Sequence, residues 1–179
     1  LVNIGEAALD QPFWEQLDAA VETKVLLRRD DQNLLAELAD CDCLLLGYQV
    51  DTPREIIDAA PGLKYIGILA TAFGTVDLEY AASKNIPVTN LGGYSNESVA
   101  EFSIAILLWK MRNIQEGLKR AADNNFDETG MRARELRGSE FGVVGLGSIG
   151  GRVAEIAAGF GAHVSYWSRS KKDVSYAYK

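Results

Sequence analysis

The sequence has one histidine, two cysteines and no apolar run long enough to cross a membrane. A bilayer-spanning helix needs roughly 20 apolar residues, and the longest run here covers only residues 104–109. A metal site would need more Cys or His side chains close together. His163 is far along the chain from Cys41 and Cys43, so we expect reduced thiols and no metal site.

The sequence also has fewer basic than acidic residues. The chain has 18 Lys and Arg against 25 Asp and Glu, a formal net charge of −7. An acidic surface repels phosphate backbones, which argues against nucleic-acid and anionic-membrane partners. No signal peptide is recognisable at Leu1, and both ends of the chain look trimmed. Together with the reduced cysteines, this leads us to expect a cytoplasmic protein. Its apolar residues, 47% of the chain, are enough for a core.

The first ninety residues alternate between short apolar runs and amphipathic segments, a pattern typical of βα units and a parallel sheet. The predicted strands cover residues 1–4, 24–27, 43–47, 63–69 and 86–90, and the predicted helices 11–20, 32–39, 54–60 and 76–83. Thr52, Pro53 and Glu55 resemble a capping box for the third helix. We assign residues 1–91 to a flavodoxin-like α/β domain.

A long helix is predicted after the glycine turn at residues 91–94, over roughly 97–122. Its first half is apolar almost all round, which indicates burial against more than one neighbour, as in a helix that links two domains or packs in a dimer. Residues 123–140 read as a loop. A new unit then begins, with a strand over 140–144, a helix over 149–160 and a strand over 162–167. Residues 92–179 are thus predicted to hold this helix and the first βαβ unit of a second domain.

The motif G-x-G-x-x-G occupies residues 145–150. It follows a predicted strand and opens a predicted helix, the context that indicates dinucleotide binding. Gly145 would allow the tight turn, Gly147 the approach of a pyrophosphate, and Gly150 close packing of helix on strand. Amide groups near Ser148 and Ile149 would face the phosphates. The alternative is a glycine turn of purely structural use.

The residues after the second strand of this unit bear on the choice of dinucleotide. An acidic residue there would bind a ribose 2′-hydroxyl, but the sequence has Ser168, Arg169 and Ser170 followed by two lysines. Serine and arginine can bind a 2′-phosphate, which an acid would repel. We therefore predict NADP(H) over NAD(H). The alternative is that the basic residues form only a solvated loop and NAD is used.

The segment 136–150 resembles the entry to the cofactor domain of the D-isomer-specific 2-hydroxyacid dehydrogenases, of the glyoxylate and hydroxypyruvate reductase kind. Further blocks at residues 63–66, 76–77, 85–90 and 98–101 agree in order and spacing with that family. The resemblance implies a flavodoxin-like substrate domain, a Rossmann cofactor domain and an active site between them. The implied reaction interconverts a 2-oxo acid and a D-2-hydroxy acid.

The resemblance also implies substrate-binding residues. Backbone N–H groups of the loop that contains Ala72, Phe73 and Gly74 would hold the substrate carboxylate. The sequence departs from the family there, since glycine is usual at Ala72 and asparagine is common at Gly74, which alters backbone freedom. The cleft near the nicotinamide would be lined by residues 94–99, with Ser95 and Asn96 as polar side chains and Val99 at the cofactor. Helix capping is the alternative role for Ser95 and Asn96.

The family's catalytic arginine, histidine and acidic residue lie later in the cofactor domain than these 179 residues reach. His163 follows the fingerprint helix, does not match the catalytic histidine, and is expected to be an ordinary exposed or edge-strand residue. We therefore expect the chain to be an N-terminal portion, truncated within the cofactor domain, without catalytic residues and inactive alone. A homodimer through the 97–122 helix is also expected. The alternatives are a non-catalytic dinucleotide-sensing or dimerisation protein and a degraded remnant.

Overall fold

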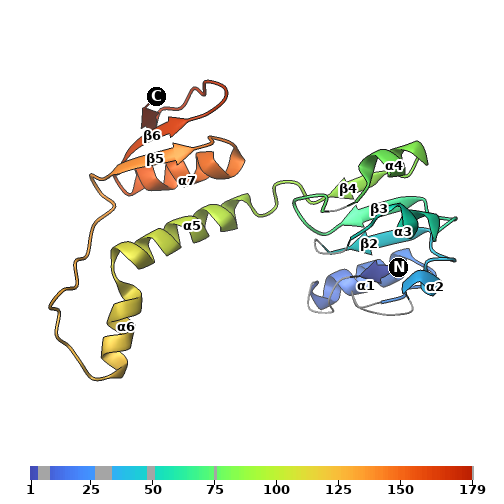
Figure 1. The fold of residues 1–179 in the computed structure, drawn as a ribbon, viewed down its shortest axis with the longest axis horizontal. Helices are drawn as coiled ribbons and strands as arrows, with labels where there is room; N and C mark the ends of the chain where they lie inside the picture. Colours follow the sequence, from blue (N-terminus) through green and yellow to red (C-terminus); the bar gives the residue numbers. More distant parts are fainter. Residues whose placement is uncertain (4–8, 27–33, 48–50, 75, 179) are drawn as a thin grey trace. The chain divides into compact units, whose positions relative to one another are not determined.

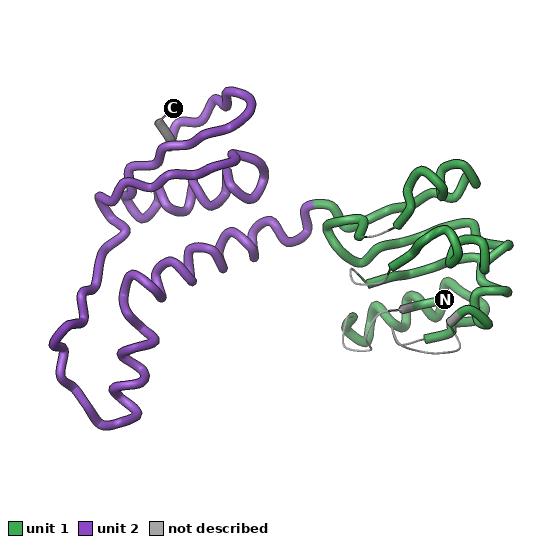
Figure 2. The backbone as a smooth tube through the Cα atoms, viewed as in Figure 1, with its two compact units in different colours: residues 1–92 green, residues 93–179 purple. Residues whose placement is uncertain are grey.

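The computed structural model describes residues 1–3, 9–26, 34–47, 51–74 and 76–178. The chain forms two compact units, Leu1–Gly92 and Gly93–Lys179, which Figure 2 colours separately. Both units are built from helices and parallel strands, so the predicted α/β fold class is confirmed. Within the described residues, no helix combines the length and the apolar character that crossing a bilayer requires.

The first unit contains a parallel sheet in the order β1 (Val2–Asn3), β2 (Cys43–Leu46), β3 (Tyr65–Ile68) and β4 (Val88–Asn90) (Figure 1). Val2 also makes an isolated parallel bridge to Leu26, in the segment predicted as the second strand. That bridge places the Leu26 segment next to β1 at the edge of the sheet. If the five predicted strands are numbered along the chain, with the Leu26 segment second, their order is 2-1-3-4-5, the arrangement of flavodoxin-like sheets. Residues 4 and 27, where two predicted strands end, lie outside the described residues.

The described residues of this unit also form the helices α1 (Gln11–Ala20), α2 (Leu34–Glu37), α3 (Arg54–Asp58) and α4 (Leu78–Ser83). The predicted capping box is wrong in one respect, because α3 has Pro53 rather than Thr52 as its N-cap residue. Thr52 lies one position earlier with its side chain fully buried. Its carbonyl accepts a hydrogen bond from the Asp77 amide, which joins the entrances of α3 and α4.

The core of the first unit lies between the sheet and its helices. Leu38, Leu44 and Ile66 are fully buried and anchor it. The remaining buried members come from the strands, from α3 and α4 and from the turns between them: Cys41, Leu46, Ile57, Ala60, Leu63, Ile68, Ala70, Ala81 and Ile86. The two cysteines are free thiols, Cys41 buried and Cys43 half-buried. The buried strand residues belong to the short apolar runs from which the strands are predicted.

The predicted single helix over 97–122 is wrong: the structure has two helices, α5 (Asn96–Met111) and α6 (Ile114–Ala122). Asn113 breaks the helix with φ 53° and ψ 35°, the left-handed conformation that asparagine adopts more readily than most residues. The Asn113 side-chain amide donates to the Arg132 carbonyl at 2.8 Å, which ties the break to the following loop. A sequence rich in helix-forming residues does not reveal this break.

The second unit has a parallel sheet in the order β5 (Glu140–Val144), β6 (His163–Trp167) and β7 (Ala177–Tyr178), with α7 (Ser148–Gly159) between β5 and β6. The predicted βαβ unit is thus present, but β7 was not predicted. Ala154 and Ala157 of α7 are fully buried and pack with Ile104 of α5 in the core of this unit. On the other face of the sheet, Val144 and Trp167 are 84% and 63% exposed.

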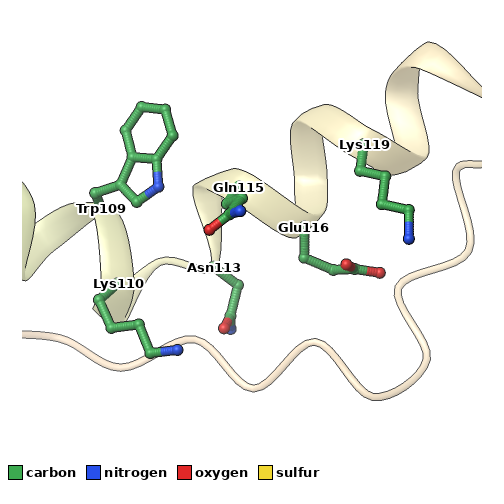
Figure 3. A pocket seen from close by; sticks show the side chains of 6 residues that line it. All are labelled: Trp109, Lys110, Asn113, Gln115, Glu116 and Lys119. Atoms are coloured by element: carbon green, nitrogen blue, oxygen red, sulfur yellow. The ribbon is translucent and has the colours of Figure 1, made fainter.

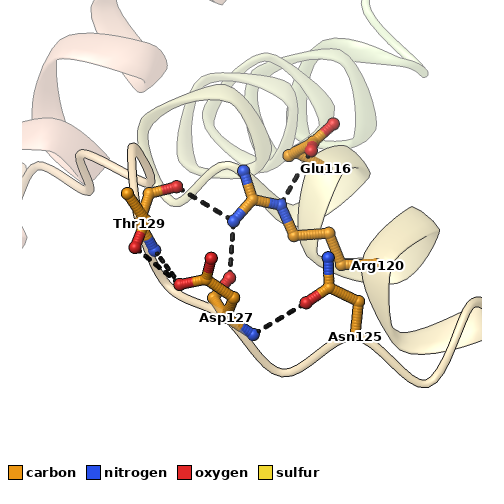
Figure 4. Close-up of polar contacts among 5 residues, drawn as sticks. All are labelled: Glu116, Arg120, Asn125, Asp127 and Thr129. Carbon is orange, nitrogen blue, oxygen red and sulfur yellow. Dashed lines mark hydrogen bonds and ion pairs between the residues drawn. The ribbon is translucent and has the colours of Figure 1, made fainter.

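Residues 123–139 form the loop expected from the sequence, and Arg120 organises its beginning (Figure 4). The Arg120 guanidinium lies 2.8 Å from the Glu116 carboxylate and donates to the carbonyls of Asp127 and Thr129. The Asp127 carboxylate in turn accepts from the backbone and hydroxyl of Thr129. The end of α6 and the loop are therefore joined by a connected set of hydrogen bonds.

Candidate dinucleotide and substrate sites

The glycine motif forms a tight turn between β5 and α7. Gly145 has φ +100°, a backbone conformation that L side chains rarely adopt. A Cβ added at Gly150 would lie 2.0 Å from the Gly145 carbonyl oxygen, so only glycine allows this close approach of helix and turn. Leu146, between the glycines, is buried in the core of the unit. Two of the three glycines are therefore required by the turn itself.

Gly147 differs from the other two glycines of the motif. It is the N-cap residue of α7 with φ −85°, which any residue can adopt, and an added Cβ would meet nothing within 4 Å. The fold therefore does not require glycine there. Open space above a backbone at a helix N-terminus suits the close approach of a phosphate group. The exposed Ser148 and Ile149 follow in the first turn, and the turn fits the pyrophosphate of a dinucleotide.

The loop that follows β6 lies next to the glycine turn. The Gly145 amide donates to the Trp167 carbonyl at 2.7 Å, so Ser168 directly follows a residue that is bonded to the turn. Ser168 is half-buried, whereas Arg169 and Ser170 are exposed. The structure thus brings together the predicted phosphate-binding and ribose-binding residues at the carboxyl ends of parallel strands, where open α/β sheets bind ligands.

The start of α5 is held against α7 in the same unit. The Arg152 guanidinium lies 2.8 Å from the Glu97 carboxylate and 2.8 Å from that of Glu155. These two carboxylates, Glu155 first, raise the pKa of Arg152 above its ordinary value. Ser95 is the N-cap residue of α5, but its side chain makes no capping hydrogen bond. The capping role considered for Ser95 is therefore not observed.

Two other predicted residues lie at the same helix start. Asn96 is half-buried and is the first residue of α5, and its backbone amide donates to the Gly93 carbonyl at 3.2 Å. Val99, one turn further along, is 39% exposed, while its neighbour Ala100 is fully buried in the unit. Asn96 and Val99 thus lie near the Glu97 contact to α7, in the same unit as the glycine turn.

The predicted carboxylate-binding loop lies in the first unit, after β3. The Asn90 side chain donates to the Thr71 carbonyl at 2.7 Å and holds the loop to the end of β4. Ala72, Phe73 and Gly74 are all exposed there. Gly74 has φ +61°, a conformation that asparagine also adopts, whereas Ala72 is not in the left-handed region. The two departures from the family pattern are thus compatible with this backbone.

Hollows among the described residues also lie away from the glycine turn. One, of about 420 Å³, lies where α5 meets α6 (Figure 3) and is lined by Trp109, Lys110, Asn113, Gln115, Glu116 and Lys119. It contains none of the predicted site residues. Another, of about 470 Å³, lies along β4 and the end of α4 in the first unit, and Phe73 contributes to its lining. Hollow size alone does not identify the predicted sites.

His163 begins β6 and is exposed, as expected, but β6 is the central strand of its sheet rather than an edge strand. Among the residues that the structure describes, no three His, Cys, Asp or Glu side chains are grouped as metal ligands. Sequence reasoning missed two relationships at the candidate site: the contact of Arg152 with Glu97 and the bonds that Tyr166 makes to the loop after β6. Neither leaves a recognisable pattern of residue types.

Comparisons with known proteins show the family of this chain. The sequence model of the D-isomer specific 2-hydroxyacid dehydrogenase catalytic domain matches residues 4–172. A Staphylococcus saprophyticus protein named as a 2-hydroxyacid dehydrogenase is 36% identical over 146 residues, which cover 80% of this chain and 46% of that protein. A Staphylococcus epidermidis protein of the same name is 37% identical over 140 residues, covering 76% and 44%.

Solved structures give the same result. D-lactate dehydrogenase from Aquifex aeolicus, solved with NAD and lactic acid, superposes with a TM-score of 0.83 at 28% identity, over 96% of this chain and 51% of that one. NAD-dependent formate dehydrogenase from Staphylococcus aureus, solved with NAD, gives 0.80 at 27% identity, over 93% and 52%. The chain spans about half the length of the relatives it matches. It belongs to the family of D-isomer specific 2-hydroxyacid dehydrogenases.

Proposed function

We propose that the chain is the N-terminal portion of a nicotinamide-dinucleotide-dependent oxidoreductase that interconverts a 2-oxo acid and a D-2-hydroxy acid. The observation that carries the proposal is the open backbone at Gly147, where glycine is not needed by the fold but leaves room for a ligand. The D-lactate dehydrogenase and the formate dehydrogenase described above were both solved with NAD. When bound, the dinucleotide would supply or accept the hydride.

The residues of this chain would bind and orient. Gly145, Gly147 and Gly150, with Ser148 and Ile149, would hold the pyrophosphate at the start of α7. Val99 would lie against the cofactor, and Ser95 and Asn96 would offer polar side chains near the nicotinamide. Backbone amides of residues 72–74 would hold the substrate carboxylate. The first unit would thus hold the substrate carboxylate, and the second unit would hold the cofactor and contribute Ser95 and Asn96 to substrate binding.

The acid/base group is proposed to lie outside these 179 residues. Hydride transfer to a carbonyl needs a proton donor within hydrogen-bond reach of the oxygen. The only histidine, His163, begins β6, whereas ligands in such sheets bind at the carboxyl ends of the strands. We therefore expect the chain alone to bind dinucleotide and to lack turnover. A longer chain that includes the acid/base group is expected to reduce a 2-oxo acid, which assays with glyoxylate and hydroxypyruvate would test.

The preference between the two dinucleotides is a finer proposal. Ser168 and Arg169 support a 2′-phosphate, and the first acidic residue after Trp167 is Asp173. The relatives solved with NAD do not support a preference for NADP. Calorimetric titration of the protein with NADPH and with NADH tests the proposed preference for NADP(H). Tighter binding of NADPH is the expected result, and tighter binding of NADH would restrict the proposal to NAD.

We further propose that a second copy of the chain covers the exposed apolar side chains of the helices that follow the first unit. Phe102 and Ile106 of α5 and Leu118 of α6 are between 52% and 66% exposed. Large exposed apolar side chains are often covered in an interface when they gather in a patch, and we propose that these do. The second candidate function is that of a non-catalytic dinucleotide-sensing or dimerisation protein, and the exposed apolar side chains support its self-association. It would show as a dinucleotide-dependent change in oligomeric state without turnover in the longer protein.

A further inference from the structure

The Tyr166 hydroxyl makes two hydrogen bonds to one residue across the loop that follows β6. It donates to the Lys172 carbonyl at 2.7 Å and accepts from the Lys172 amide at 3.0 Å. The paired register of β6 with β7 covers only Val164 and Ser165. Tyr166 therefore closes residues 168–171 into a short loop at a place where the sheet ladder does not hold them.

The ring of Tyr166 is fixed by the core of its unit. It is half-buried and packs in the cluster that contains Val153 and Ile156 of α7. The other end of the loop is fixed as well, because the Trp167 carbonyl accepts the Gly145 amide. Both ends of the loop are thus held to the elements that form the glycine turn, so the loop and the turn share one frame.

The loop that is closed in this way carries only polar and basic side chains. Ser168, Arg169, Ser170 and Lys171 lie inside it, and Asp173 is the first acidic residue beyond Lys172. A flexible loop loses conformational entropy when it orders around a ligand, whereas a loop held in place beforehand avoids that loss. We propose that Tyr166 is a positioning residue that holds this loop ready for the 2′-phosphate of a dinucleotide, an inference that rests on the proposed function.

The test is Tyr166→Phe, which keeps the packed ring and removes both hydrogen bonds. Dissociation constants for NADPH and NADH are measured by calorimetry on the wild type and the variant. We expect NADPH binding to weaken roughly three- to tenfold, in line with the net strength of one or two hydrogen bonds, and NADH binding to change less than about twofold. Amide exchange of Lys172 should be slow in the wild type and faster in the variant.

Tyr176→Phe is the matched control. Tyr176 packs in the same cluster, and its hydroxyl donates to the Gly151 carbonyl at 3.2 Å rather than to the loop. Its removal should leave the ratio of the NADPH and NADH dissociation constants unchanged. An equal effect of Tyr166→Phe on both dinucleotides, no effect, or an unprotected Lys172 amide in the wild type overturns the inference alone. A wild type that binds neither dinucleotide overturns the proposed function as well.

Discussion

The Arg152 guanidinium of α7 lies 2.8 Å from the Glu97 carboxylate in the first turn of α5. The contact joins residues far apart in the sequence and sits beside fully buried alanines of both helices, Ala100 and Ala154. Because Glu97 lies between Asn96 and Val99, the same contact fixes the helix start to which we assign a role at the nicotinamide. The packing of α5 on α7 thus links two parts of the candidate cofactor site.

We predict that charge reversal at either position, Glu97→Arg or Arg152→Glu, lowers the thermal midpoint of unfolding slightly and that the double reversal restores it. The side chains are 64% and 36% exposed, so solvent and salt screen the pair and the effect should fade in about 1 M salt. Glu155→Gln is the control, since it removes only the partner on α7 itself. Additive losses in the double variant would show that the two charges do not interact.

Gly150→Ala should destabilise the second unit by about 2–3 kcal/mol or more, because its methyl group would collide with the Gly145 carbonyl oxygen. Chemical denaturation measures the loss. The matched control is Gly159→Ala at the end of the same helix, where an added Cβ meets nothing within 4 Å. That substitution should be neutral or stabilise by up to about 1 kcal/mol. Equal stability of the two variants would contradict the described turn.

Acid should weaken the first unit through two carboxylates. Hydrogen bonds from the Arg54 guanidinium and the Tyr80 amide hold the pKa of Asp77 below its ordinary value. Hydrogen bonds from the Tyr80 hydroxyl and, to a smaller extent, from Lys84 lower the pKa of Asp58. A carboxylate whose pKa is lowered by folding stabilises the folded state at pH values above its unfolded-state pKa of about 4. This stabilisation is lost as the pH falls through the pKa of the folded state.

We therefore predict that stability falls below about pH 4 and that the fall is shallower in Asp77→Asn and Asp58→Asn. Asp58 is exposed and Asp77 is half-buried, so solvent screens both groups in part and the change is modest. Urea denaturation between pH 2 and 7 measures it. Asp10→Asn, at a residue with no partner of this kind among the described contacts, is the control. An unchanged slope in both variants would show that these bonds do not stabilise the unit.

The proposed pairing with a second copy predicts that Leu118→Glu shifts the protein toward a monomer in sedimentation velocity experiments. Leu118 of α6 is 59% exposed, and a charge there would be unfavourable in an apolar interface. Leu35→Glu is a matched control, because Leu35 is equally exposed but lies on α2 of the first unit. A wild type that is monomeric at all concentrations, or equal shifts from both variants, would contradict the pairing.

Much of the fold could be predicted because its local patterns and its tertiary structure agree. The apolar strands of the first unit and the glycine turn before α7 have distinct signatures that the structure confirms. The break at Asn113 could not be predicted, since it depends on one backbone conformation and a bond to Arg132. The short strand β7 follows a polar stretch, and pairing with β6 rather than its own sequence defines it.

The candidate site divides in the same way. Gly145, Gly147 and Gly150 could be identified from spacing, because glycine leaves a recognisable motif. The structure adds a distinction that spacing does not contain: the turn needs Gly145 and Gly150, whereas it does not need Gly147. The bonds from Tyr166 to Lys172 arise only when β6 and its loop are folded, so no sequence pattern indicates them.

The binding of NADPH and NADH to the wild type, Gly147→Ala and Gly159→Ala tests the central claim most directly. We expect dinucleotide binding to the wild type and to Gly159→Ala. Gly147→Ala should keep the wild-type thermal midpoint but bind at least about tenfold more weakly, a difference of roughly 1.4 kcal/mol, because its methyl group would occupy the space left for the pyrophosphate. Unchanged affinity in Gly147→Ala, or no binding to the wild type, would contradict the account.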